Sequence, residues 1–549
     1  MNNKHFVEYL VHQTQHLRSL VEECLCDTSA SPSRGSLGVL YDLLRNDQNY
    51  GFSIETIEQF ADFYAQTTVY TSFVLRYLHH RRSVLTIDQI GLLLPSTTPF
   101  IRQVLQQMFT VSEVQVSSAI ASLLREISTI DVKRLFKEQS DPVIHFYPLF
   151  LHAYDPSSQQ QQGVYYTPIE VVDFIVRSID SQFKTHFGLP LGLASSKRWE
   201  ALIDDPENLQ VDGQSMFVRI LDPATGTGVF IQQVFKRIRD TLKQHWQAKG
   251  WSRSDMRLEW QAYLRGCKGR ESDYTGHGLL SRIEAFELMP TPLMVAHLQI
   301  GHLLANDPDL PFVFSETDSL SIQLRDALAT QQETCWTVIV GNPPFFGNST
   351  QQSPFIKDLL QVYKREPNQL ESLKERQFRW LNDDYVKFIR LAEHYITTSG
   401  LGIVGYITPH GFLDNPTFRG MRWHLWRTFD DLYLLDLHGN GRKQETTVTG
   451  TSDENIFGIL QGVSISLLVK HTLQTETQYG NLYHVGRYGL AASKRKFLAK
   501  STLDTIGWVG VLPLSEHFQY HFFSPLVTES VADFYQGFSL QRLFQDLDG

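Results

Sequence analysis

Apolar side chains recur at three- and four-residue steps through the first 160 residues, the spacing of amphipathic helices. The clearest run is "SIETIEQFADFYAQTTVYTSFVLRYLHHRR" (53–82), which has an acidic first turn and a basic end, as expected of a helix. Two further runs, "TPFIRQVLQQMFT" (98–110) and "IASLLREIST" (120–129), repeat the pattern. The polar stretch "DPSSQQQQG" (155–163) is typical of a boundary loop. This part is therefore predicted to be helical.

After residue 164 the rhythm changes to short apolar runs separated by helical patterns. Helices are expected at 167–180, 229–248, 291–305, 321–330 and 383–398. The expected strands are "FVRILD", "RIEAFEL", "FVFSETD", "TVIVGN", "GIVGYIT", "LYLLDL" and "GVSISLLVK". Such alternation is typical of a doubly wound α/β fold whose sheet is mostly parallel.

The changes in pattern predict three regions. A helical domain covers residues 1–160, an α/β domain covers 161–475, and a more weakly patterned segment covers 476–549. The last segment ends at "SLQRLFQDLDG" without an obvious closing element, so we expect the chain to be truncated there. A length of 549 residues agrees with two or three domains.

Composition narrows the class of protein. The chain is 42% hydrophobic and 20% charged, as in ordinary globular proteins. Its four scattered cysteines suit neither a disulfide framework nor a four-ligand zinc site, so we predict a reducing, cytoplasmic setting and no metal. No apolar run approaches the roughly 18–20 residues of a membrane span. A formal charge of −10 argues against nonspecific coating by nucleic acid but allows a local basic groove.

The first candidate site is "FVRILDPATGTGVFI" (217–231), a strand, a tight turn and the start of a helix. Ligands of doubly wound sheets bind at the carboxyl ends of strands, where this turn lies. Gly226 and Gly228 allow a ligand to approach the backbone, but Ile231 stands where a dinucleotide fingerprint needs its third glycine. Asp222 would repel a pyrophosphate and suits a cationic or amine-bearing ligand. The alternative is that Asp222 caps the helix and the glycines merely turn the chain.

Two more acids follow predicted strands. Glu287, in "RIEAFEL", is placed to accept hydrogen bonds from ribose hydroxyls, and Asp318, after "FVFSE", could accept from an adenine amino group. Between Asp222 and Glu287 an insertion at about 250–280 is expected. Three acids at successive strand ends predict a pocket for a positively charged nucleoside, which S-adenosylmethionine satisfies.

The second candidate site is "NPPF" (342–345), directly after the strand "TVIVGN". Prolines remove backbone donors and leave carbonyls free. The Asn342 side chain and the Pro343 carbonyl then offer two acceptors to one NH₂ group, which frees the lone pair of its nitrogen for attack on a methyl group. Phe345 offers a face on which a flipped base can stack. Taken alone, the tetrapeptide would equally suit an Asn-Pro turn with buried aromatics.

In this order the motifs resemble those of gamma-type N6-adenine DNA methyltransferases. The resemblance rests on "GVYYTPIEVVDFIV", "DPATGTGVF", "FEL", "SETDSL" and "NPPF". Downstream, "NDDYVKFIRLAEHYI", "GIVGYITPHGFLDNPTFRGMR" and "LYLLDLHGN" resemble the large methyltransferases of single-chain restriction–modification and phage-defence systems. Residues 60–160 resemble the coupling domain that precedes the methyltransferase in those proteins.

The resemblance implies a role for each matched residue. S-adenosylmethionine would contact Thr167, Asp222, Ala224, Gly226, Gly228, Glu287 and Asp318. Asn342, Pro343, Pro344 and Phe345 would form the catalytic motif. "NIFGILQGVSISLLVK" (455–470) resembles the segment whose phenylalanine packs against the flipped adenine, which nominates Phe457; a plain core aromatic is the alternative.

We therefore expect a site-specific adenine methyltransferase that binds double-stranded DNA, is active in the cytoplasm, and acts with partner proteins of a defence system. The family's nuclease and helicase motifs are missing ahead of the coupling region, and the chain stops before the usual target-recognition domain, so its DNA specificity stays open. Two alternatives remain: a glutamine N5-methyltransferase acting on protein, because the Asn-Pro-Pro-aromatic grip suits any planar NH₂, and a non-catalytic DNA-binding or assembly subunit.

Overall fold

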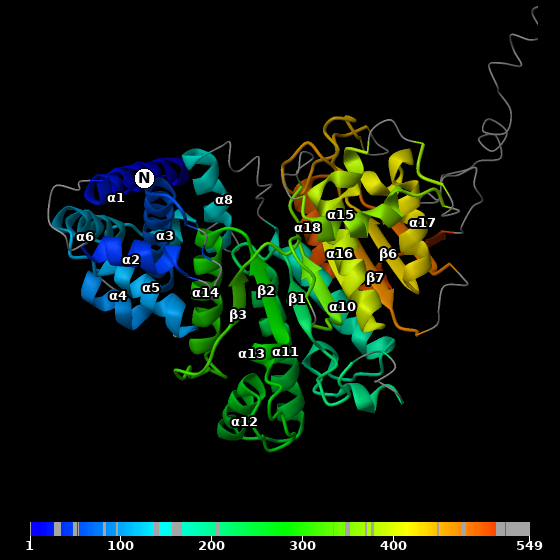
Figure 1. The fold of residues 1–549 in the computed structure, drawn as a ribbon. Helices are drawn as coiled ribbons and strands as arrows, with labels where there is room; N and C mark the ends of the chain where they lie inside the picture. Colours follow the sequence, from blue (N-terminus) through cyan, green and yellow to red (C-terminus); the bar gives the residue numbers. More distant parts are fainter. Residues whose placement is uncertain are drawn as a thin grey trace, which may run out of the picture.

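The computed structural model gives the fold of the chain (Figure 1). It describes residues 2–26, 35–47, 52, 54–80, 84–94, 97–136, 142–155, 167–204, 209, 211–332, 334–345, 352–367, 371–374, 378–446, 450–473, 479–511 and 522. The domain boundary predicted at residues 160–161 lies outside these ranges. None of the described helices is both long enough and apolar enough to cross a membrane.

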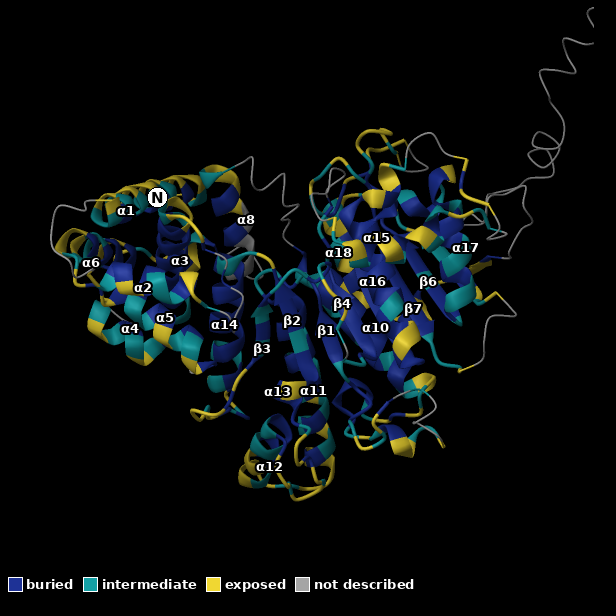
Figure 2. Cartoon of the chain, viewed as in Figure 1, coloured by how far each residue is buried: buried dark blue, intermediate teal, exposed yellow. Residues whose placement is uncertain are grey.

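Every element described before residue 155 is a helix, in agreement with the apolar periodicity. These are α1 (Asn3–Cys26), α2 (Ser36–Arg45), α3 (Ile57–Leu78), α4 (Ile87–Leu93), α5 (Pro99–Phe109), α6 (Val114–Ser128), α7 (Val132–Leu135) and α8 (Pro142–Tyr154). Helix α3 begins with a capping box, in which Thr56 accepts from the Gln59 amide and Gln59 reaches back to Thr56. Almost the whole of α3 is buried, because the other helices pack around it (Figure 2).

The later strands join one nine-stranded sheet in the order β3-β2-β1-β4-β5-β7-β6-β8-β9. Their bounds are β1 (Ile220–Asp222), β2 (Ile283–Glu287), β3 (Ser321–Leu324), β4 (Val338–Gly341), β5 (Gly402–Pro409), β6 (Asp431–Asp436), β7 (Val463–Lys470), β8 (Asn481–Gly486) and β9 (Val509–Val511). Strands β3, β2, β1, β4 and β5 are mutually parallel. Strand β7 is antiparallel to both of its neighbours, and β9 is antiparallel to β8. The sheet is thus parallel in one half and mixed in the other.

Helices cover both faces of the sheet. The helices of this part of the chain are α10 (Ile169–Thr185), α11 (Val229–Ala248), α12 (Arg253–Arg265), α13 (Leu279–Arg282), α14 (Pro290–Ala305), α15 (Pro354–Leu359), α16 (Asp384–Ser399), α17 (Arg419–Thr428) and α18 (Ala491–Lys500). Single 3₁₀ turns are η1 (Gly192–Ala194), η2 (Trp199–Ala201), η4 (Leu360–Lys364), η5 (Trp380–Asn382), η6 (His410–Leu413), η7 (Pro416–Phe418) and η8 (Leu503–Thr505).

Strand β5 shows why both faces need a cover. All eight of its residues are buried. A side chain at Gly405 would meet Ile175 and Ile179 of α10, whereas one at Gly402 would meet Ile396 of α16. Positions three apart on a strand point to opposite faces, so α10 and α16 lie on opposite sides of the sheet.

The N-terminal helices pack against the β3 end of the sheet through α14 (Figure 1). Thr67 of α3 lies 3.1 Å from Thr291 of α14 (Oγ1 to Oγ1), and Thr97 Oγ1 lies 3.4 Å from His297 Nδ1. Because α3 covers the face of α14 that turns away from the sheet, α14 is buried nearly all round. This explains its continuous apolar sequence.

Two expected elements need correction. The strand expected at "FVFSETD" and the helix expected at 321–330 are wrong: the described strand is β3, Ser321–Leu324. Its alternating half-buried and buried residues suit an edge strand, and they pair with Glu284–Glu287 of β2.

The sheet also continues past residue 476 through β8 and β9, and Arg177 of α10 donates to the Leu498 and Ser501 carbonyls near α18. The C-terminal segment is therefore built onto the same sheet as far as Val511.

Candidate active site at the carboxyl edge

The carboxyl ends of β2, β1 and β4 lie side by side at the centre of the parallel half of the sheet. They end at Glu287, Asp222 and Gly341, and Asn342 follows directly. The parallel register brings these residues to one edge, although 120 positions separate Asp222 from Asn342 in the sequence. The two motifs that the sequence nominated therefore share one site.

The glycine turn after β1 is fastened to β2. The Thr225 amide donates to the Phe286 carbonyl at 2.9 Å, and the Gly226 amide donates to Glu287 Oε2 at 2.7 Å. These bonds fix the turn as it enters α11, whose N-cap is Gly228.

The two glycines of the turn serve different purposes. Gly226 has a φ of 56°, and a Cβ there would have no atom within 4 Å. Gly228 has a φ of 83°, and a Cβ there would lie 3.0 Å from Ile300 and 3.1 Å from Ala296 of α14. Gly228 is therefore required for packing, whereas Gly226 borders open space into which a ligand can approach.

Asp222 is completely buried at the tip of β1. Its Oδ1 accepts from the Ala224 amide at 3.2 Å, and its Oδ2 is a buried oxygen without a hydrogen-bond partner among the described residues. Burial raises the pKa of Asp222 to about 7. A Cβ at Gly341 would come within 3.0 Å of Oδ1, so only glycine lets β4 end this close to the carboxylate.

Glu287 uses both of its oxygens within the fold. Besides Oε2, which binds Gly226, its Oε1 accepts from the Met289 amide at 2.8 Å. Burial raises the pKa of Glu287. The next side chain, Leu288, is 56% exposed.

The side-chain amide of Asn342 is held by a residue far away in sequence. Its Nδ2 donates to Thr167 Oγ1 at 2.9 Å, and Thr167 stands just before α10. The Asn342 Oδ1 is buried and has no hydrogen-bond partner within the described part of the chain. The bond to Thr167 thus orients the amide so that its acceptor remains available. Sequence reasoning nominated Thr167 for the cofactor; the contact recorded here is with Asn342.

Two aromatic residues nominated by the sequence meet at this edge. The rings of Phe345 and Phe457 are edge to face, with centroids 6.3 Å apart and an angle of 83° between their planes. The Phe457 amide donates to Asn455 Oδ1 at 2.8 Å, which fixes its backbone. Phe345 is buried, and Phe457 is partly buried. Pro343 and Pro344 link Phe345 to Asn342.

Asp318 does not join the other acids. It precedes β3, and Arg265 binds its carboxylate through Nε at 3.0 Å and Nη2 at 2.9 Å. Burial by itself would raise its pKa, but Arg265 and Ser315 hold the pKa of Asp318 below the ordinary value. With β3 at Ser321–Leu324, Asp318 lies near the amino end of that strand.

Sequence reasoning missed Asp326, the acid beyond the carboxyl end of β3. Its neighbour Arg325 donates its amide to the Glu287 carbonyl at 2.7 Å, which continues the β2–β3 pairing. Asp326 accepts from the Leu328 amide at 2.9 Å, and burial raises its pKa. The signal in the sequence was the alternation in "SIQL" just before Arg-Asp, which the more aromatic "FVFSETD" outweighed.

Tyr406 of β5 was also missed; its hydroxyl is buried, and β4 places Gly341 beside it.

Comparison with known proteins supports the fold at low sequence identity. No protein-family model and no curated protein matches the sequence. A DrdV–DNA complex matches with a TM-score of 0.63 and 18% identity, over 96% of this chain and 46% of the other. The ATP-dependent Type ISP restriction–modification enzyme LlaBIII bound to DNA matches with a TM-score of 0.62 and 20% identity, over 94% of this chain and 33% of the other.

A third structure, a nuclease-deletion mutant of the Type ISP restriction–modification enzyme LlaGI with a DNA substrate mimic, matches with a TM-score of 0.61 and 19% identity, over 96% of this chain and 39% of the other. The chain thus spans less than half the length of each of these proteins. At this identity the likeness shows a shared fold, which extends over 94–96% of this chain.

Proposed function

We propose that the chain is a DNA methyltransferase that transfers a methyl group from S-adenosylmethionine to N6 of a flipped adenine, within a restriction–modification or phage-defence system. The observation that carries the proposal is the Asn342 amide, whose nitrogen is bound to Thr167 while its buried oxygen keeps an acceptor position available. A buried acceptor without a partner is costly unless a ligand satisfies it.

The residues around the glycine turn suit S-adenosylmethionine. Asp222 offers a buried carboxylate oxygen to a cationic ligand, and Gly226 leaves space for that ligand beside the backbone. Glu287 fixes the turn, the exposed Leu288 offers an apolar surface to a purine, and Asp326 extends the row of acids to β3. When bound, the cofactor supplies the methyl group.

The motif after β4 would hold the target amine. Asn342 Oδ1 and the Pro343 carbonyl accept hydrogen bonds from the two amine hydrogens, which orients the nitrogen and localises its lone pair. Phe345 and Phe457 offer two ring surfaces at right angles, against which a base taken out of the duplex can pack. Thr167 then acts as a positioning residue for Asn342, in addition to the contact with the cofactor that the resemblance implies.

The proposal assigns the first 160 residues to a coupling domain and the sheet to the methyltransferase domain. DNA as the partner is supported by the three structural neighbours, all described as bound to DNA or to a DNA mimic. Because the chain covers 33–46% of those proteins, the choice of target site is proposed to need a segment or partner beyond the described residues.

The test is methylation mapping in a host that lacks adenine methylation. Cells carrying the wild-type gene with its neighbouring genes should gain N6-methyladenine at one sequence motif, and the Asn342→Ala variant should lose it. Asn306→Ala, an exposed change at the end of α14, is the matched control and should methylate normally. Methylated glutamine in protein would favour the other enzyme class. No new methylation with the wild type would overturn the proposal.

Calorimetry of the purified proteins separates the two halves of the site. Asn342→Ala should leave the affinity for S-adenosylmethionine within about twofold, because its acceptor serves the amine. Asp222→Ala should weaken that affinity by about tenfold or more, the scale of a charged hydrogen bond of roughly 1.5–3 kcal/mol.

A further inference from the structure

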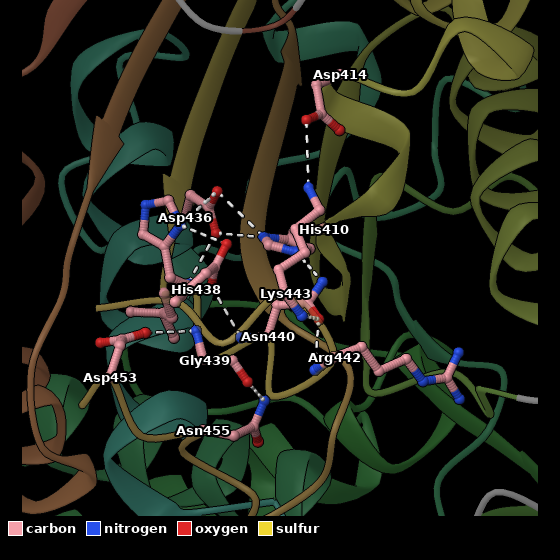
Figure 3. A network of polar contacts seen from close by, with 12 residues as sticks. His410, Asp414, Asp436, His438, Gly439, Asn440, Arg442, Lys443, Asp453 and Asn455 are labelled. Carbon is pink, nitrogen blue, oxygen red and sulfur yellow. Dashed lines mark hydrogen bonds and ion pairs between the residues drawn. The ribbon is translucent and has the colours of Figure 1, made fainter. Parts of the chain in front are cut away.

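A second cluster of chemically competent side chains lies at the same edge of the sheet, but at the ends of β5 and β6 (Figure 3). His410 follows β5, Asp436 ends β6, and His438 and Glu445 lie on the connection from β6 to β7. Strand β7 lies between β5 and β6 and is antiparallel to both, so it begins at the edge where β5 and β6 end. The sequence predicted no metal, and that expectation rested on the scattered cysteines.

Four ligand-type groups converge there. His410 Nδ1 lies 3.0 Å and 3.2 Å from the two carboxylate oxygens of Asp436. His438 Nδ1 lies 3.4 Å from Asp436 Oδ2 and 3.8 Å from Glu445 Oε1. One ligand atom from each of His410, His438 and Glu445 falls within 4.8 Å of the other two.

The His438 side chain has unsatisfied bonding capacity. It is 9% exposed, and its Nδ1 is buried without a hydrogen-bond partner among the described residues. The ring stacks on Tyr488 with centroids 3.7 Å apart. Its Nε2 packs closely against Gly486, where an added Cβ would lie only 2.7 Å away. His438 also has a φ of 51°, which is strained for a residue other than glycine. The backbone and both ring neighbours thus hold Nδ1 toward the carboxylates.

The groups behind the cluster orient it as the outer groups of a metal site do. The Asn440 amide donates to Glu445 Oε2 at 2.8 Å, which leaves Oε1 facing His438. The His438 amide donates to Asp436 Oδ1 at 2.8 Å. The Asn440 side-chain amide donates to His410 Nε2 at 3.3 Å, which fixes the ring with Nδ1 facing Asp436. Metal binding at Nδ1 would displace the proton that this nitrogen donates to Asp436. Such supporting bonds fix the orientation of metal ligands.

We propose that His410, His438 and Glu445, together with Asp436, bind a divalent transition metal of the Zn²⁺ class. Two imidazoles and two carboxylates are donors that Zn²⁺ accepts in a four-coordinate site. With all four donors supplied by the protein, the site would be structural. The proposal does not depend on the methyltransferase assignment.

The metal fastens the connection between β6 and β7, the segment that carries Phe457. Within it, the Gly439 amide donates to Asp453 Oδ2 at 2.6 Å, and Asn455 Nδ2 donates to the Gly439 carbonyl at 3.3 Å. The backbone at Gly439, one residue after His438, is therefore bonded to Asn455, which in turn holds the Phe457 amide. Metal binding at His438 stabilises the placement of Phe457 beside Phe345.

The experiment uses the full chain, stripped with a chelator and titrated with zinc chloride against a chromophoric competitor. Wild type should bind one Zn²⁺ at this cluster and unfold at a higher temperature with zinc than without. Glu445→Gln keeps the size of the side chain and should lower zinc affinity by at least the roughly 10–100-fold that loss of a supporting group produces. His438→Ala should abolish binding at this site, with circular dichroism to verify the fold.

A second set of His and Asp side chains, His186, Asp431 and His471, provides the matched control. His471→Ala should leave the zinc bound by the first cluster unchanged. Two results would overturn the proposal: zinc content that falls in His471→Ala but not in Glu445→Gln, or a correctly folded wild type that binds no zinc. With Co²⁺ as a probe, visible absorption bands of a tetrahedral site should appear in wild type and vanish in His438→Ala.

Discussion

The two halves of the carboxyl edge carry the same kinds of acid but surround them differently. In the parallel half, Asp222 and Glu287 are buried, and burial raises the pKa of both, that of Asp222 to about 7. In the mixed half, burial would do the same to Asp436 and Glu445, but the imidazoles of His410 and His438 hold their pKa values below the ordinary range.

This difference separates a site for an exchangeable ligand from a site that supports the fold. A carboxylate oxygen left without a partner beside open space, as at Asp222, favours a cation that arrives from solution. Acids whose cationic and imidazole partners come from the same chain, as at Asp436 and Asp453, hold segments together. In the two proposals above, the perturbed acids at one end of the sheet serve the cofactor and those at the other end support the fold.

The largest expected effect lies in the mixed half. Lys494 and Asp453 form an ion pair at 2.9 Å, and both side chains are completely buried. Lys494→Ala leaves the Asp453 charge buried without its cation and should lower the free energy of unfolding by about 3–5 kcal/mol. Lys496→Ala, exposed on the same helix, is the control and should change it by less than about 0.5 kcal/mol. If urea unfolding showed equal losses of stability for Lys494→Ala and Lys496→Ala, the structural role given to the buried ion pair would be refuted.

Next in size is the contrast between the two glycines. Gly228→Ala combines a left-handed backbone with a collision against α14 and should cost about 2–3 kcal/mol of stability. Gly226→Ala should cost only about 1 kcal/mol but should weaken S-adenosylmethionine binding, because its methyl group enters the open space. Unfolding curves and calorimetry on both variants test this. If only Gly228→Ala weakened cofactor binding, Gly228 and not Gly226 would be the glycine that borders the ligand.

A smaller effect should appear in the pH dependence. With the pKa of Asp222 at about 7, affinity for the cationic cofactor should fall about tenfold from pH 8 to pH 6, as the carboxylate takes up a proton. Because this pKa is raised, the contribution of Asp222 to stability is full at low pH and is lost as pH rises through about 7. Asp222→Asn should flatten both profiles. Unchanged profiles in the variant would show that another group titrates.

The smallest expected effect distinguishes the acids around β3. Asp326→Asn should weaken S-adenosylmethionine binding about three- to fivefold, the scale of one neutral hydrogen bond. Asp318→Asn should leave the affinity unchanged and lower stability by about 0.5–1 kcal/mol, because it weakens the ion pair with Arg265. The opposite result would restore Asp318 to the cofactor site.

Local chemistry in the sequence determined much of this protein. The strand–glycine–helix turn, the strand that ends just before Asn342, and the helices before residue 155 follow from apolar spacing and from the backbone demands of glycine and proline. These signals lie within a few residues of one another, so they can be recognised without knowledge of what packs against them.

The tertiary structure alone decided the rest. The "FVFSETD" run is more strand-like than "SIQL", but pairing with β2 selected "SIQL" and so separated Asp318 from Asp326. The bond from Asn342 to Thr167 crosses 175 residues, and the cluster of His410, Asp436, His438 and Glu445 forms because the order of β5, β7 and β6 brings their ends together. Contacts between distant segments depend on strand order and register, which no local pattern encodes.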